Sequence, residues 1–368
     1  MFEYLTRDFL CDSPTSAFIP EISHFGDLHA EIVASEKSAV VVPVSQLVRI
    51  RLTGRDRAKF LHNLCTNNVR DLQAGAACEA FFTDARARVI AHGWILAAAE
   101  YHEIWMFAET GETILKHLNR YIISEDVTVS CPERPVETIA ILGPEIISMV
   151  NSAFSPESLP AAALQWIPLV SQPSEHTASA LMILLLELAG RPVMLISVCD
   201  PLSTSVSLAE TWQRLIDSGC TPAGFHTLLR LRILERLPRI GTDMTIDHMA
   251  PEADRNATAI SYRKGCYLGQ EPIARLDALG HINRAIRTLR IRTADDQSLT
   301  AGAEVQLEGV GTIGHVTSFC RDIDPEYSLG MGMIRIHNLN FTAGVTVLDS
   351  PGNSLSAEVL PPTSTDTQ

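Results

Sequence analysis

Ten residues around position 268 combine several side-chain types that carry out chemistry. They read Arg263-Lys264-Gly265-Cys266-Tyr267-Leu268-Gly269-Gln270-Glu271-Pro272. The two cations before Cys266 would favour its thiolate, which is the reactive form of a cysteine. The glycines at 265 and 269 permit backbone conformations and close approaches that a Cβ atom would block. The segment predicts a reactive or redox-sensitive thiol beside a ligand, and the alternative is a buried structural cysteine.

The end of this segment has the composition of a helix start. Pro272 suits a first helical turn, where its missing N–H costs nothing, and Glu271 would complement the positive end of the helix dipole. Gln270 and Glu271 therefore either only begin the helix or also contact a ligand. Arg275 lies one turn after Glu271, at the spacing of an ion pair within a helix.

The chain is acidic, but positive charge is concentrated around the same segment. Its 368 residues carry a formal net charge of −14, which argues against general binding to nucleic acids or anionic membranes. Residues 226–292 nevertheless hold 12 Lys and Arg against 7 Asp and Glu. This basic island either makes ordinary surface ion pairs or forms a pocket for a small molecule that bears carboxylates.

The cysteines and the hydropathy pattern restrict the compartment and the kind of site. The eight cysteines show no metal-ligand spacing such as C-x-x-C, and neither do the histidines, so no metal site is predicted. Most thiols are expected to be small buried apolar groups. No window reaches the ~18 uninterrupted apolar residues of a membrane span, and the charged residues near the start do not fit a signal peptide. The sequence therefore predicts a cytoplasmic protein.

The chain has two regions with different sequence patterns, and the secondary-structure elements predicted from these patterns position the residues above. Before residue 285, apolar strands alternate with amphipathic helices that begin near residues 54, 112, 143, 207, 228 and 270, which predicts an α+β region. The helix near 228 is expected to end at Pro238, and residues 151–175 are expected to be rich in loops. After residue 285, short strands alternate with Gly, Asp and Pro turns, which predicts a small antiparallel barrel or sandwich. The last residues, 361–368, are expected to be disordered.

A family resemblance rests mainly on the cysteine segment. Lys264-Gly265-Cys266-Tyr267-x-Gly269-Gln270-Glu271 is similar to the signature of the YgfZ-type folate-binding proteins, which are relatives of the aminomethyltransferase (T-protein) of the glycine cleavage system. The segments 60–69 and 237–243 resemble two further pieces of the family pattern. Ala274, Arg275, Gly280 and Arg284 continue it, and order and spacing agree from about residue 40 to 350.

The resemblance implies a fold, a cofactor and a set of site residues. It implies a ring of α+β subdomains in residues 1–284 around a central cavity that holds tetrahydrofolate or another folate derivative. A C-terminal antiparallel β-barrel would occupy residues 285–360. Cys266 and Lys264 are the candidates for chemistry. The side chains expected to contact the folate are Asn67, Glu235, Arg239, Tyr267, Gln270, Glu271 and Arg275. Arg239 and Asp243 are alternatively a structural pair, and Lys264 is alternatively a solvated charge.

The chain departs from the transferase pattern where that pattern needs acidic groups. Ala91-His92 stands where the T-protein has the Asp-Asp pair required for aminomethyl transfer, and Asn68 replaces a further carboxylate. An asparagine of the T-protein has no counterpart near Glu109. The family glutamate that holds the pterin aligns with Leu234, one residue before Glu235. Because one position on a helix rotates a side chain by roughly 100°, the carboxylate of Glu235 would point in a different direction from that of the family glutamate.

Three functions are consistent with these residues. The leading hypothesis is a tetrahydrofolate-binding protein that acts in the assembly or repair of iron–sulfur enzymes, with assembly proteins or client enzymes as partners. Its thiol would react with a one-carbon unit, an oxidant or a cluster sulfur. The alternatives are a folate-dependent aminomethyltransferase or methyltransferase, against which the missing carboxylates argue, and a folate-binding scaffold without chemistry.

Overall fold

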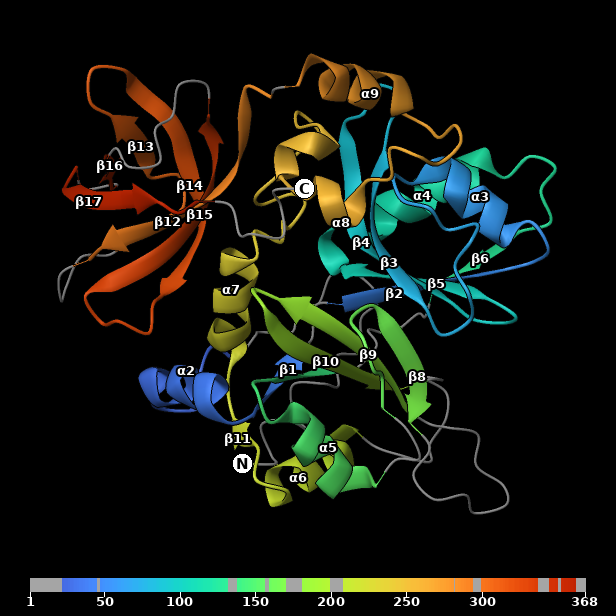
Figure 1. Cartoon of the computed structure of the whole chain (residues 1–368), viewed down its shortest axis with the longest axis horizontal. Helices are drawn as coiled ribbons and strands as arrows, with labels where there is room; N and C mark the ends of the chain where they lie inside the picture. Colours follow the sequence, from blue (N-terminus) through green and yellow to red (C-terminus); the bar gives the residue numbers. More distant parts are fainter. Residues whose placement is uncertain are drawn as a thin grey trace.

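The computed structural model describes residues 22–44, 47–131, 138–155, 159–169, 181–198, 208–280, 282–293, 299–336, 344–349 and 352–361. Figure 1 shows two β-sheets, each with helices on its outer face, and a β-barrel beside them. The predicted α+β fold with a C-terminal antiparallel barrel is confirmed. The barrel strands run from Arg284 to Val359, and the tail beyond Pro361 lies outside the described residues.

The first sheet has six strands, and its apolar residues point to both faces. Its order is β11 (Thr221–Pro222), β1 (Val40–Val44), β7 (Thr138–Leu142), β10 (Arg191–Val198), β9 (Leu181–Leu188) and β8 (Gln165–Leu169). All neighbours are antiparallel except β1 and β11. Alternate residues such as Val41 and Ile183 pack under α5 (Ile146–Phe154) and α6 (Leu208–Asp217), while Val40 and Leu184 face the other way. Burial on both faces explains why these strands read as continuous apolar runs.

The second sheet has five antiparallel strands. Its order is β3 (Ala77–Thr83), β4 (Val89–Ala97), β5 (His102–Phe107), β2 (Leu47–Thr53) and β6 (Thr128–Ser130). Helices α3 (Arg57–Leu64) and α4 (Gly111–Tyr121), the latter preceded by the short 3-10 helix η1 (Ala108–Thr110), cover its outer face. Phe60, Leu61 and Leu64 face the sheet, as their spacing predicted.

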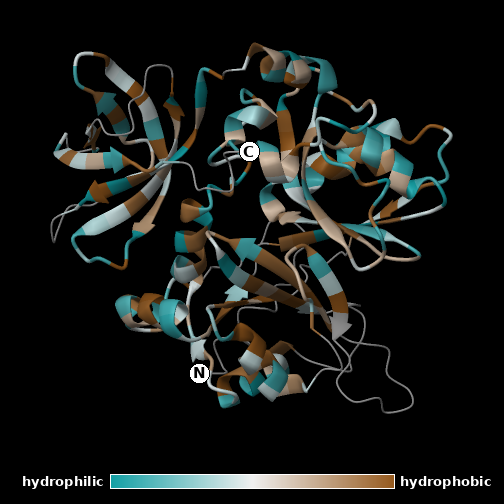
Figure 2. Cartoon of the chain, viewed as in Figure 1, coloured by the Kyte–Doolittle hydropathy of each residue, from teal (hydrophilic) through white to brown (hydrophobic). Residues whose placement is uncertain are grey.

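A hydrophobic cluster joins the inner faces of the two sheets at the centre of the molecule. Trp94 and Trp105 of the second sheet meet Leu184 and Leu195 of the first. Figure 2 shows the corresponding concentration of apolar residues where the sheets face one another. Helix α7 (Phe225–Leu234) contributes Leu231 to this cluster and contacts β14 (Gly311–Arg321) and β15 (Tyr327–Arg335) of the barrel, so it connects the sheets to the barrel.

The barrel is closed and entirely antiparallel. Its order is β12 (Arg284–Arg292), β15 (Tyr327–Arg335), β14 (Gly311–Arg321), β13 (Glu304–Leu307), β16 (Val345–Leu348) and β17 (Ser354–Val359). Alternate residues of β17 are buried and exposed, as a barrel wall requires. This last strand was not predicted, because its alternating Ser and Glu residues hide the apolar half of the pattern.

Short elements between α7 and the barrel carry the cysteine segment. These are the 3-10 helix η2 (Ala250–Ala253), α8 (Asn256–Ala259) and α9 (Gln270–Leu279). Helix α9 starts at the predicted position with Glu271 in its first turn. Its N-cap, Gly269, has a φ of 85°, and a Cβ atom there would lie 2.6 Å from the carbonyl oxygen of Asp84. This close packing against the β3–β4 turn explains the glycine.

The sequence expectations were also wrong at other places. Helix α2 (Leu28–Lys37) was not predicted, and β8 lies inside the region expected to be rich in loops. Helix α7 ends at Leu234 rather than at Pro238. Arg236 has a φ of 56° there, and the amides of Arg236 and Leu237 bond back to the carbonyls of Ile233 and Arg232. This Schellman motif ends the helix before the proline can do so.

Candidate functional site

A narrow apolar cavity lies between the two sheets and α7. Its volume is about 20 Å³. We call it the central cavity, and it is lined by Val44, Leu47, Trp94, Phe107, Leu186, Leu188, Val193, Leu195, Phe225, Leu228, Arg232 and Leu237. Apart from Arg232, the lining residues are aliphatic or aromatic. The cavity therefore suits an apolar group that approaches one cation.

A larger and more polar pocket adjoins the central cavity on the barrel side. Its volume is about 350 Å³. We call it the arginine pocket, and it is lined by Ser23, Phe225, His226, Leu229, Arg232, Arg239, Thr242, Thr317, Ser318 and Phe319. Phe225 and Arg232 line both spaces, so they form the boundary between them. An apolar cavity and a cationic pocket thus share one wall.

Arg232 is anchored at this boundary but keeps one donor unused. Its side chain is 3% exposed, and its Nη1 donates to Oδ2 of Asp243 at 2.5 Å and to the Leu237 carbonyl at 3.1 Å. The other carboxylate oxygen of Asp243 accepts hydrogen bonds from Thr317 and Ser318 of β14. Within the described part of the chain, Nε of Arg232 has no hydrogen-bond partner. A buried donor without a partner is costly, and a ligand acceptor would remove that cost.

Arg239 contributes the second cation of the arginine pocket. Its Nη2 forms an ion pair with Glu109, and its guanidinium carbon lies 5.2 Å and 5.9 Å from the ring centroids of Phe107 and Phe225. Its backbone N–H donates to Asp243 at 2.8 Å. The predicted pair of Arg239 and Asp243 therefore exists as a hydrogen bond from the Arg239 backbone. This bond fixes the segment that places Arg239 in the wall of the pocket.

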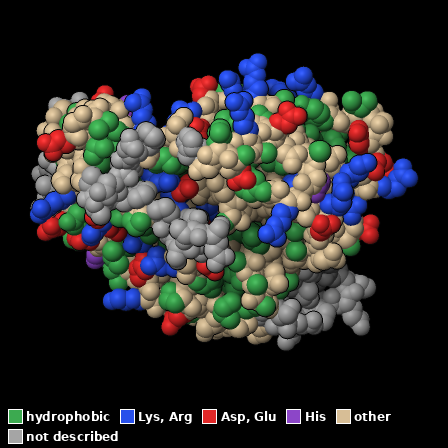
Figure 3. Space-filling view, turned by 45° about the horizontal axis from the view of Figure 1, so that its top comes forward, with side chains coloured by type: hydrophobic (Ala, Val, Ile, Leu, Met, Phe, Trp, Pro, Cys, Tyr) green, Lys and Arg blue, Asp and Glu red, His purple; other side chains and the backbone are tan. Residues whose placement is uncertain are grey.

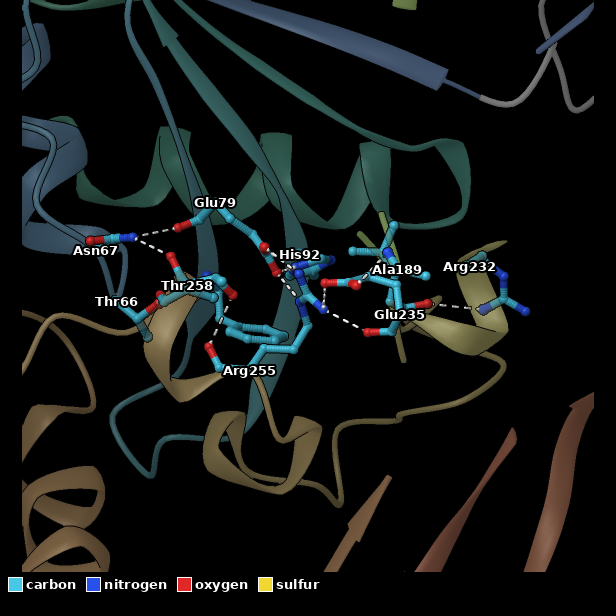
Figure 4. A network of polar contacts seen from close by, with 12 residues as sticks. Thr66, Asn67, Glu79, His92, Ala189, Arg232, Glu235, Arg255 and Thr258 are labelled. Carbon is cyan, nitrogen blue, oxygen red and sulfur yellow. Dashed lines mark hydrogen bonds and ion pairs between the residues drawn. The ribbon is translucent and has the colours of Figure 1, made fainter. Parts of the chain in front are cut away.

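A buried ionic network lies next to these cavities (Figure 4). Glu79 of β3 forms an ion pair with Arg255, whose Nη2 donates to Oε2 of Glu79 at 2.7 Å, and Nε2 of His92 lies 2.7 Å from Oε1. Arg255 also donates to the carbonyl and the carboxylate of Glu235 at 2.8 Å and 3.0 Å. The second carboxylate oxygen of Glu235 accepts from the amide of Ala189 at 2.7 Å. Glu235 is thus held by two structural partners beside the central cavity.

The network keeps Glu79 ionised. Burial opposes its ionisation, but the charge and hydrogen bonds of Arg255 and the hydrogen bond from His92 outweigh burial and hold the pKa of Glu79 well below its usual range. Burial likewise acts against the charge on Arg255, yet Glu79 and Glu235 raise the pKa of Arg255 above its ordinary value. A carboxylate of such low pKa is a weak general base. The network therefore organises the site rather than supplying a proton acceptor.

Lys264 occupies a structural position in the described chain. Its Nζ donates to the carbonyls of His62, Cys65 and Asn67 at 2.5, 2.8 and 2.7 Å, which uses its three N–H bonds. These carbonyls belong to the end of α3, where a cation complements the helix dipole. The side chain is buried, and burial lowers the pKa of Lys264. Its Nζ also lies 4.8 Å from the ring centroid of Tyr267, another predicted site residue, which is buried.

Cys266 is exposed, unlike the other cysteines that the structure describes. Cys65, Cys78, Cys220 and Cys320 are buried, as predicted for most thiols, and Cys131 is half-buried. The buried-cysteine alternative for Cys266 is therefore wrong. Figure 3 shows Lys and Arg side chains gathered along the upper edge of the molecule in that view.

The remaining predicted residues divide between the two regions. Gln270, Glu271 and Arg275 lie on α9, and no ion pair joins Glu271 to Arg275 among the described contacts. The amide of Asn67 donates to the carbonyls of Glu79 and Thr258, which ties it to the ionic network. None of residues 263–275 lines the central cavity or the arginine pocket. The structure thus brings Arg239 to the arginine pocket, holds Glu235 in the ionic network, and keeps the cysteine segment outside the lining of both spaces.

Sequence reasoning missed three charged residues that build this region: Glu79, Arg232 and Arg255. Glu79 gave a signal, since it is a lone charge in the apolar run Ala77-Cys78-Glu79-Ala80-Phe81. Such a charge is buried only with a partner. Arg255 lies in a polar loop and gave no comparable signal.

The described residues meet neither the requirements of a metal site nor those of a membrane-spanning helix. They contain no cluster of three or more His, Cys, Asp or Glu side chains that could hold a metal ion. Within the same ranges, no helix has both the length and the apolar character required to cross a membrane.

Comparisons with known proteins agree with the predicted resemblance. The GCVT N-terminal domain family matches residues 13–181. A chloroplast protein of Arabidopsis thaliana, whose name proposes a transferase, is 27% identical over 321 residues, which cover 85% of this chain and 69% of that protein. YgfZ of Colwellia psychrerythraea, named a tRNA-modifying protein, is 24% identical over 250 residues, which cover 67% of this chain and 70% of YgfZ.

A solved structure shows the same fold. The glycine cleavage system aminomethyltransferase T from Bartonella henselae superposes with a TM-score of 0.73 at 17% sequence identity, over 91% of this chain and 88% of that chain. At this identity the likeness concerns the fold. The resemblance predicted from the cysteine segment is confirmed.

Proposed function

We propose that this relative of the YgfZ and aminomethyltransferase T proteins binds a tetrahydrofolate in its central cavity and acts in the assembly or repair of iron–sulfur enzymes. The observation that carries the folate proposal is the pair of adjoining spaces, apolar inside and cationic outside. A folate has the matching sequence of parts: a flat ring system, an aromatic linker and a glutamate with two carboxylates. The confirmed family resemblance supports the same ligand.

Binding requires the central cavity to widen. Its volume of about 20 Å³ has room for about one water molecule. A pterin ring is larger than a water molecule, so the aliphatic side chains at the wall must change rotamer. Leu186, Leu188 and Leu228 are the movable part of that wall, whereas Glu235 and Arg255 are fixed by the ionic network.

The same geometry disfavours aminomethyl transfer in this chain. Ala91 and His92 stand where the transferase pattern has its carboxylates, and the His92 ring is bonded to Glu79. Glu79 is the nearby carboxylate, but its very low pKa makes it a weak proton acceptor. A binding protein without aminomethyl transfer fits these side chains better. We therefore expect neither ammonia nor methylene-tetrahydrofolate from a lipoyl-bound aminomethyl substrate.

Cys266 supports the iron–sulfur part of the proposal. It is exposed and lies outside the lining of both cavities. A thiol in this position is accessible to a partner protein. We therefore propose that its thiolate attacks a disulfide of an iron–sulfur client, which forms a mixed disulfide and releases the client's other sulfur as a thiolate. The folate would then regulate or accompany this step from the central cavity.

Titration with folinic acid tests the folate proposal. Calorimetry should show binding at micromolar strength or tighter, and saturating ligand should raise the melting temperature, because binding to the folded state stabilises it. Leu186→Trp fills the central cavity and should weaken binding by about tenfold or more, equal to ~1.4 kcal/mol. The matched control is Leu279→Trp at an exposed site on α9. Neither heat nor a melting shift with the native chain would refute the proposal.

A further inference from the structure

A short segment after α7 joins the barrel to the wall of the central cavity. We call residues 237–243 the strap. Leu237, at its start, lines the central cavity, and Arg239 lines the arginine pocket. Asp243, at its end, is 2% exposed and accepts hydrogen bonds from two hydroxyl groups of β14 at 2.7 and 2.6 Å. The strap is therefore anchored to the barrel at its end.

On the side of the second sheet, the strap is held through Arg239. Its Nη2 forms an ion pair with Glu109 of η1, which directly follows β5. The guanidinium carbon lies 5.2 Å from the ring centroid of Phe107 and 5.9 Å from that of Phe225. Both of these residues line the central cavity. Arg239 therefore connects the strap to the second sheet and to two rings of the cavity wall.

The two attachments of the strap differ in how easily they can break. The side chains of Arg239 and Glu109 are 13% and 26% exposed, so water can replace either partner. An ion pair in contact with water contributes little stability, and salt weakens it further. By contrast, the ion pair of Asp243 with Arg232 is almost inaccessible, at 0% and 3% of the two side chains. The strap is therefore fixed at the barrel and releasable at the second sheet.

The central cavity is closed while this contact is made. Its volume of about 20 Å³ admits about one water molecule. A larger group can enter from the arginine pocket only when the wall shared by the two spaces gives way, and Phe225 is part of that wall. Movement of this ring away from Phe107 separates at least one of the rings from the guanidinium of Arg239. The contacts of Arg239 therefore favour the closed state.

We propose that the Arg239–Glu109 pair is a latch that keeps the central cavity closed by holding the strap against the second sheet. Release of the pair frees the strap and the ring of Phe225, which opens the cavity toward the arginine pocket. The function of the latch rests on the proposed folate binding, whereas the latch itself consists only of contacts within the chain. The inference assigns Glu109 a role in controlling access to the cavity.

Hydrogen exchange of the full chain without ligand tests the latch directly. Glu109→Gln should increase the exchange rates of the strap amides about two- to fivefold, the range expected for an ion pair that is partly in water. Raising the salt concentration from about 0.05 M to about 0.5 M should also increase the native rates. Glu112→Gln is the matched control and should leave the rates unchanged, because Glu112 is 81% exposed and pairs with Lys116 on α4. Equal rates in the native chain and the Glu109 variant, or an equal increase in both variants, would overturn the inference.

Stopped-flow mixing with folinic acid separates this inference from the proposed function. Association should be about two- to fivefold faster for Glu109→Gln than for the native chain, because the open state is more populated, and unchanged for Glu112→Gln. Binding to the native chain with the same association rate in the Glu109 variant would overturn the latch and leave folate binding intact. Binding to none of the three chains would refute the folate proposal, and the hydrogen-exchange result would still decide whether the latch exists.

Discussion

The buried ion pair between Glu79 and Arg255 restricts the positions of the side chains and loops around it. Both side chains are almost inaccessible, and each has a further partner, His92 for Glu79 and Glu235 for Arg255. A buried pair adds little net stability, but breaking it leaves a charge without compensation. At the residue scale, this pair therefore fixes the position of Glu235 and the surrounding loops rather than acting on a substrate.

Arg255→Met tests this role. It should lower the free energy of unfolding by about 3–5 kcal/mol at pH 7, because Glu79 remains buried and ionised without its partner. The loss should shrink toward pH 5, since burial then favours protonation of Glu79. Urea denaturation at the two pH values measures both effects. Arg55→Met removes a pair with an 87% exposed arginine and should leave the free energy of unfolding close to that of the native chain.

Cys266 differs from this buried ion pair because its thiol is exposed, so we expect it to contribute little to the stability of the fold. Cys266→Ser should leave the melting temperature unchanged and abolish complementation in a strain that lacks this protein and has low iron–sulfur enzyme activity. Cys131→Ser, at a half-buried thiol, is the control and should complement. Full complementation by the Cys266 variant would contradict the proposed thiol role.

Helix α3 shows how one distant side chain secures an element. Its last carbonyls have no partner within the helix, and Lys264, two hundred residues later in the chain, donates to those of His62 and Cys65 and to that of Asn67 just beyond. The same lysine was predicted to act in chemistry beside Cys266. In the folded chain its contacts attach the cysteine segment to the end of α3.

Lys264→Met separates the two roles of this lysine. It should lower the free energy of unfolding by about 1–3 kcal/mol, because buried carbonyls lose their donors. Lys59→Met, at an exposed position of the same helix, is the matched control and should change stability by less than about 0.5 kcal/mol. A stable Lys264 variant that nevertheless fails in cells would instead support a chemical role.

At the scale of the whole molecule, several histidines are buried among apolar groups or cations, which couples stability to pH. Burial lowers the pKa of His62 from 6.5 to about 4, helped by the charges of Lys264 and Arg70, and burial and Arg57 lower that of His102 to about 4. The unfolded chain therefore binds more protons between pH 6.5 and 4, so folding stability falls as pH decreases through this window.

Urea titrations between pH 7.5 and 4.5 measure this dependence. The unfolding midpoint should decrease below pH 6.5, and His102→Phe should reduce the slope, because one of the protonation differences is removed. The same substitution at exposed His29 is the control. An unchanged slope in the His102 variant would show that the histidine does not contribute to the pH dependence.

The sequence alone determined the fold class and most elements. Strands such as β7 and β9 are continuous apolar runs and the helices have one apolar face, so local patterns suffice to predict them. The family resemblance came mainly from the cysteine segment, supported by segments 60–69 and 237–243. The sequence failed at two local features: the Schellman turn at Arg236 ended α7 before the proline, and the polar half of β17 hid its apolar pattern.

Only the tertiary structure decided how the candidate residues are grouped. Arg232 and Arg239 meet at the arginine pocket because α7 is packed between the sheets and the barrel, a contact between segments far apart in the chain. The same packing turned Lys264 toward α3 and left Cys266 on the surface. Residue types and local spacing state what chemistry a side chain can do. Whether its atoms face a ligand, a carbonyl or water depends on long-range packing, which no local pattern encodes.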